Sequence, residues 1–217
     1  MTTRSLCWFV VMVSFRRSVF GMRDTWYADN RDLVKWGVLL RLAERFDAVR
    51  ILHVAFYRES EFASLVIDGQ QVDVPQSVIA HFRDLRAVAA MRSKVRITVF
   101  DPIFDDREAY LQSLTAIQTA FARERCLVFL DPDTGLEPRN PGLEHVLAGE
   151  ASVIWGNLKP GDVFAFYQHQ TNRAGQEWIE PKRLQLAQAL GVPLDVLKIA
   201  TAPAIAQDVA FYFAQRT

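Results

Sequence analysis

Residues 126–135 read Cys126-Leu-Val-Phe-Leu-Asp131-Pro-Asp133-Thr-Gly135, an apolar run that ends in two carboxylates, a proline and a glycine. Five apolar residues bounded by turn-forming residues are typical of a buried strand in an α/β sheet. Ligands of open α/β sheets bind outside the carboxyl ends of the strands. The stretch therefore predicts a buried strand and, at Asp131 and Asp133, a candidate site.

Helical and strand-like segments alternate on both sides of this stretch. Apolar spacings of three and four residues predict helices over 32–46, 75–91, 106–125, 141–147 and 177–190. Short apolar runs predict strands over 51–57, 95–100, 126–130, 163–168, 194–200 and 208–214. Strands that follow each other directly pair antiparallel. We therefore expect a three-layer Rossmann-like α/β fold, with a mostly parallel sheet and an antiparallel C-terminal strand pair.

The composition is that of an ordinary globular domain. Half of the 217 residues are apolar, and 25 basic residues balance 25 acidic ones. A net charge of zero gives no global attraction to nucleic acid or to an anionic membrane. Two cysteines, Cys7 and Cys126, are too few for a disulfide framework or a cysteine zinc site. This usage fits a reducing cytoplasm, where we expect the protein.

The first 21 residues form a separate segment. Arg4 precedes an apolar run over residues 6–15, and Arg16 and Arg17 follow it. The run is too short to span a bilayer as a helix, and no small-residue cleavage site follows it. We interpret residues 1–21 as an N-terminal extension: a mis-assigned start before Met22, a packed segment or a targeting-like segment. The single α/β domain is expected over residues 22–217.

Further polar residues are expected at the same edge of the sheet as Asp131. Gln168 and His169 end the next strand and Arg173 follows, which offers a general base and an anion-binding guanidinium. A helix start near Asn30 can hold an anion through its backbone N–H groups. We assign Asp131, Asp133, His169 and Arg173 to catalysis, and Tyr27, Asp29, Lys35, Asp101 and Gln168 to substrate binding.

Each of these features also has a purely structural interpretation. The Asp131 stretch can be a tight turn, in which proline presets φ and glycine allows a positive φ. Asp32 can cap the helix that begins there, with Lys35 solvated. His53 lies inside an apolar strand, where a hydrogen-bonded core histidine is expected.

From about residue 95 onward the order of elements resembles the second half of Rossmann-type, class I methyltransferases. In the amino-methylating members, an Asp/Asn-Pro-Pro-aromatic motif at this strand end holds the target amine. Asp131 and Pro132 match that motif, whereas Asp133 and Thr134 replace the second proline and the aromatic residue. The resemblance implies S-adenosylmethionine as cofactor, a nucleotide or nucleic-acid substrate, and Asp131 as the residue that orients the acceptor amine. The family's glycine-rich cofactor loop is replaced by Arg58-Glu-Ser-Glu61.

Other interpretations start from the same residues. The segment 27–35, the Asp131 stretch and Tyr167-Gln-His169 are together similar to a group of uncharacterised bacterial proteins with DPDxG and QH motifs. Asp131-x-Asp133 also resembles the first motif of haloacid-dehalogenase-type phosphotransferases. That resemblance implies a magnesium-dependent phosphoesterase or nuclease, in which Asp131 and Asp133 bind magnesium, His169 is the base and Arg173 stabilises charge. A third alternative is a non-catalytic binding or accessory protein that kept the sheet and lost the cofactor loop.

Overall fold

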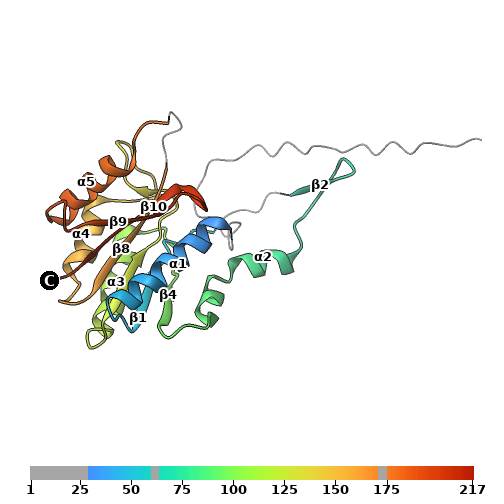
Figure 1. Ribbon diagram of the computed structural model, residues 1–217. Coiled ribbons are helices and arrows are strands. Elements are labelled where there is room, and N and C mark those ends of the chain that lie inside the picture. The colour runs from blue at the N-terminus through green and yellow to red at the C-terminus, as the bar shows by residue number, and fades with distance from the viewer. Residues whose placement is uncertain (1–28, 60–63, 171–174) are drawn as a thin grey trace, which may run out of the picture.

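A computed structural model describes residues 29–59, 64–170 and 175–217. Its centre is a six-stranded sheet (Figure 1). In spatial order the strands are β4 (Arg96–Phe100), β1 (Arg50–Val54), β5 (Cys126–Leu130), β8 (Val163–His169), β10 (Ala206–Gln215) and β9 (Lys198–Ala202). The first four run parallel, and β10 runs antiparallel to both β8 and β9. The predicted Rossmann-like sheet with its antiparallel C-terminal pair is confirmed.

Helices cover both faces of this sheet. One face carries α1 (Asn30–Arg45), which lies in front of the sheet in Figure 1, and the 3-10 helix η2 (Leu85–Ala90). The other face carries α3 (Arg107–Ala120), α4 (Ala148–Gly156) and α5 (Ile179–Leu190). Within the described residues, no helix is long and apolar enough to cross a membrane.

Side chains alternate strictly between the two cores, because successive residues of a strand point to opposite faces. Ile51, Leu127 and Val163 face α1, whereas Leu52, Val128 and Phe164 face the three-helix layer. Odd-numbered residues of β1, β5 and β8 therefore share the α1 face. This parity decides which polar residues can meet at the strand ends.

Asp29, rather than the expected Asp32, caps α1. Its carboxylate accepts the backbone N–H groups of Arg31 at 2.7 Å and Asp32 at 3.0 Å. A cap of this kind satisfies backbone donors that have no partner inside the helix. The helix therefore begins at Asn30, two residues before the predicted start, and Asp32 lies inside its first turn.

The helix predicted over 141–147 is wrong. Residues 145–146 form the short strand β7 (His145–Val146), which pairs with β6 (Gly135–Leu136), and α4 follows. The Arg107 guanidinium donates to the carbonyls of Gly142 and His145. The Gly142 carbonyl also accepts the His145 N–H at 3.2 Å, which closes a turn at this point in place of the expected helix.

The helix predicted over 75–91 is divided into α2 (Gln76–Arg83) and η2, with Asp84 between them in a non-helical conformation. Before α2, β2 (Leu65–Ile67) and β3 (Gln70–Val72) pair antiparallel as a hairpin. Asp68 and Gly69 both have positive φ, which suits a two-residue turn of this kind. In Figure 1 this hairpin lies beyond α2, away from the sheet.

Candidate functional site

A buried charged cluster lies at the carboxyl ends of β1 and β5. It consists of Lys35, His53 and Asp131, which are 4%, 5% and 0% exposed. Strand parity turns His53 toward α1, where Lys35 lies in the second turn. Lys35 Nζ lies 2.9 Å and His53 Nε2 2.7 Å from the same oxygen, Asp131 Oδ2. The predicted core histidine is therefore confirmed, and its partner is the central carboxylate of the candidate site.

Asp131 and Lys35 are ionised in spite of their burial. Burial disfavours the Asp131 anion, but the Lys35 cation and the His53 hydrogen bond outweigh it, so the pKa of Asp131 lies below its ordinary 3.8. Burial also disfavours the Lys35 cation, but Asp131 and Asp32 raise the pKa of Lys35 above 10.5. Lys35 Nζ lies 3.0 Å from Asp32 Oδ1. At neutral pH one buried cation thus lies between two carboxylates.

Two carboxylate oxygens at this edge accept no hydrogen bond within the described residues. They are Asp131 Oδ1 and Asp133 Oδ1, and both are buried. The other oxygen of Asp133 pairs with the Arg58 guanidinium, which follows β1. A buried acceptor without a donor costs about 1–3 kcal/mol, and each such group in a folded protein needs an explanation. A ligand that brings N–H or O–H groups would satisfy both oxygens.

The loop after β5 is held in place by Gln168. Its Oε1 accepts the Leu136 N–H at 2.9 Å, and its Nε2 donates to the carbonyls of Thr134 at 3.1 Å and His169 at 2.8 Å. Gly135 has φ +125°, and a Cβ there would lie 2.3 Å from Gln168 Nε2. Glycine is therefore required at this position for two reasons: its positive φ, and the close approach of the Gln168 side chain. Gln168 positions the loop, and a contact with substrate remains a prediction.

His169 belongs to a second polar group at the same edge. Its Nε2 lies 3.2 Å from Asp208 Oδ2, and Arg31 Nη2 lies 2.5 Å from that same oxygen. Burial lowers the pKa of His169 more than Asp208 raises it. The imidazole is therefore neutral at pH 7 and can accept a proton. The His169 backbone N–H also donates to the Thr134 carbonyl at 3.0 Å, which ties this group to the Asp131 loop.

The remaining predicted residues are distributed as follows. Asp29 caps α1 and forms an ion pair with Arg31 at 3.1 Å. Asp101 follows β4, on the other side of β1 from β5, and pairs with Arg86 at 2.8 Å. Tyr27 and Arg173 lie outside the described residues, as does the whole extension predicted over residues 1–21.

Sequence reasoning missed several members of the site. Arg58 and Asp208 were not singled out, and Asp32 was interpreted only as a cap, yet all three form ion pairs at this edge. The available signal was strand parity: His53, the fourth residue of β1, and Asp131, just after β5, fall on the same face once β1 and β5 are neighbours.

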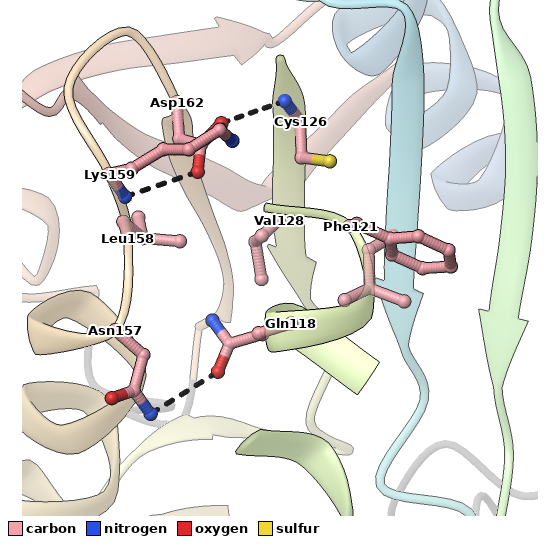
Figure 2. Close-up of a pocket in the computed structure, with 9 residues that line it drawn as sticks. Gln118, Phe121, Cys126, Val128, Asn157, Leu158, Lys159 and Asp162 are labelled. Carbon is pink, nitrogen blue, oxygen red and sulfur yellow. Dashed lines mark hydrogen bonds and ion pairs between the residues drawn. The ribbon is translucent and has the colours of Figure 1, made fainter. Parts of the chain in front are cut away.

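A shallow pocket lies at the opposite, amino-terminal edge of the sheet (Figure 2). Its volume is about 240 Å³, including space open to solvent. Asp162 joins the Cys126 N–H to Lys159 there, and burial raises the pKa of the Cys126 thiol to about 11. A thiol with that pKa is a poor nucleophile at neutral pH. The polar groups of this pocket thus hold neighbouring loops together, and the candidate site lies at the other edge.

Within residues 29–59, 64–170 and 175–217, no three His, Cys, Asp or Glu side chains are arranged to hold a metal ion. At the candidate site the carboxylates are bound by other protein groups instead. Lys35 and His53 bind Asp131 Oδ2, and Arg58 binds Asp133 Oδ2.

Comparisons with known proteins are sparse for this chain. No protein-family profile matches the sequence, and no curated protein matches it. Among solved structures, the chain is similar to a DUF574 family protein from Streptomyces avermitilis, with a TM-score of 0.44 and 12% identity. That similarity covers 87% of this chain and 82% of the other. The Rossmann-like class assigned above rests on the sheet itself.

Proposed function

We propose that the chain binds a ligand bearing an amino group, such as an aminated nucleobase, at the carboxyl ends of β1 and β5. The observation that carries the proposal is the pair of buried oxygens, Asp131 Oδ1 and Asp133 Oδ1, that accept nothing within the described residues. An amino group supplies two N–H donors to such acceptors, and hydrogen bonds to a carboxylate are stronger than neutral ones.

The position is also the one that the topology favours. The chain passes from β1 outward to β4 and then returns to β5 on the other side of β1. Ligands of open α/β sheets bind where the strand order reverses in this way. Asp131 and Asp133 follow β5, and Arg58 follows β1, so the three residues flank that point.

S-adenosylmethionine, which the methyltransferase-like order of elements implies, does not fit the described loop after β1. A cofactor cradle needs backbone that a ligand can approach closely, which glycine provides. Here Phe56 occupies a positive φ of 47°, its ring packs against Phe104 and Tyr110, and its N–H donates to the Tyr110 hydroxyl at 3.0 Å. We therefore favour a binding protein, or an enzyme that uses another co-substrate, over a methyltransferase dependent on S-adenosylmethionine.

The phosphoesterase alternative has less support from the same site. A magnesium ion needs oxygen ligands whose negative charge is available. Lys35 and His53 bind Asp131, and Arg58 binds Asp133, so the charge of both carboxylates is already balanced by protein groups.

Arg58 controls access to Asp133 under this proposal. The guanidinium is 30% exposed, and the Asp133 side chain beneath it is 2% exposed. Arg58 binds Oδ2, so a ligand that donates to Oδ1 has to pass the guanidinium and competes with it for the charge of the same carboxylate.

Thermal shift with matched nucleosides tests the proposal. Cytidine or adenosine should raise the melting temperature, whereas uridine and inosine, which carry a carbonyl in place of the amino group, should not. Asp133→Asn should weaken that binding about 10- to 100-fold, because one charged acceptor is lost. Arg58→Ala should strengthen it, because the competing cation is removed. Asp195→Asn, a change at an exposed and remote carboxylate, is the control.

Four outcomes would count against the proposal. Equal shifts with uridine and cytidine would show that the amino group is not recognised. A large shift with S-adenosylmethionine or S-adenosylhomocysteine would restore the methyltransferase interpretation, and one with magnesium or manganese would restore the phosphoesterase. Binding unchanged in Asp133→Asn would place the ligand elsewhere.

A further inference from the structure

The arm formed by residues 64–91 exposes apolar surface that the rest of the described chain does not cover. All six residues of β2 and β3 are exposed, and α2 has no buried residue. In Figure 1 the hairpin lies at the far end of α2 from the sheet. A two-stranded hairpin is at best marginally stable alone in water, and exposed apolar strands are usually interaction surfaces.

Three of the four apolar residues in β2 and β3 gather on one face of the hairpin, and Val66 lies on the other. Directly opposite residues of an antiparallel pair share a face, as do residues two apart along a strand. Leu65 pairs with Val72 and Ile67 pairs with Gln70, so Leu65, Ile67 and Val72 lie together. Their exposed fractions are 43%, 56% and 36%. Two carboxylates, Asp68 and Asp73, flank this face, and no base lies between residues 64 and 74.

Basic residues gather at the other end of the arm and just beyond it. Residues 83–96 hold five cationic side chains and one acidic side chain. Arg86 pairs with Asp101 and Arg96 with Glu124, but Arg92 and Lys94 form no ion pair within the described residues. Met91, beside them, is 37% exposed. One end of the arm therefore offers an apolar face with two anions, and the other an apolar residue with two cations.

We propose that the hairpin of one copy docks on residues 91–94 of a second copy, and that the reverse contact forms at the same time. The two ends are separated by α2, so a hairpin cannot reach residues 91–94 of its own chain without the arm folding back. A two-fold axis makes each contact twice, because surface i meets surface j and j meets i. Such a dimer covers both apolar ends and pairs Asp68 and Asp73 with Arg92 and Lys94.

Analytical ultracentrifugation of the full chain tests this arrangement. The wild-type chain should be a dimer, and Ile67→Lys should weaken the dimer about tenfold or more, because a charge then enters an apolar contact. Val153→Lys is the matched control: Val153 is 47% exposed on α4, on the opposite face of the sheet, and its change should leave the dimer intact. Circular dichroism should show the same fold for both variants.

Charge reversal distinguishes the proposed partner from other occupants. Asp68→Lys with Asp73→Lys should weaken the dimer, as should Arg92→Glu with Lys94→Glu, and all four changes together should restore it. Deletion of residues 1–21 should leave the dimer unchanged. A chain that is monomeric at every concentration, a dimer indifferent to Ile67→Lys, a failure of the fourfold variant to recover, or loss of the dimer on deletion would each overturn the proposal.

Discussion

At the scale of single residues, the Asp131 carboxylate depends on the two side chains that share its Oδ2. Removing one partner of a buried ion pair is more damaging than its net contribution suggests, because the remaining charge stays buried without compensation. Lys35→Met should therefore lower the free energy of unfolding by about 3–5 kcal/mol, as measured by urea denaturation. Lys198→Met, at an exposed lysine, should change it by less than about 0.5 kcal/mol. Equal stability of the two variants would contradict the buried network.

The Lys35–Asp131 ion pair also predicts how the loss of stability in Lys35→Met depends on pH. The pKa of Asp131 is lowered on folding, so its contribution is complete above pH 3.8 and is lost as the pH falls through the folded-state value. The pKa of Lys35 is raised, so its contribution is complete below pH 10.5 and is lost as the pH rises through the folded-state value. The stability difference between wild type and Lys35→Met should be largest between these limits and shrink on both sides. A pH-independent difference would show that packing, not charge, explains the loss.

At the scale of elements, the loop from Asp131 to Leu136 is fixed by one glycine and one glutamine. Gly135→Ala places a Cβ against the Gln168 side chain in a conformation that alanine rarely adopts. We expect it to destabilise the protein by about 1–3 kcal/mol in thermal or urea unfolding. Gly149→Ala, inside α4 with no atom within 4 Å of the added Cβ, should instead stabilise it by about 0.4–1 kcal/mol. The account of the loop fails if both substitutions have the same sign.

The order of helices and strands could be predicted from the sequence, but several of their boundaries could not. Apolar periodicity located the strands because their burial is dictated by the sheet. It misplaced α4 because the carbonyls of Gly142 and His145 are bound by Arg107, a residue 35 positions away from the nearer one. It placed the cap of α1 at Asp32 because Asp29 lies outside the apolar pattern.

At the scale of the whole molecule, the sheet gathers most of the predicted site residues at one edge. Asp131, Asp133 and His169 could be placed there from the rule that parallel strands present their carboxyl ends together. The ion pairs could not, because they depend on the strand order and on parity, which set His53 and Lys35 against Asp131. Asp101 was expected at the same edge and lies there, but β1 separates it from β5 and Arg86 binds it.

Under the proposed function, Asp131 and Asp133 receive the amino group of a ligand. Carbon-13 NMR of the aspartate carboxyl groups tests it most directly, with cytidine and uridine as the two titrants. Asp162, which binds the Cys126 N–H at the opposite edge of the sheet, is an internal reference. We expect cytidine to shift the Asp131 and Asp133 carboxyl signals and to leave Asp162 unchanged, and uridine to shift none of the three. Unmoved Asp131 and Asp133 signals at saturating cytidine, or equal shifts with uridine, would contradict the account.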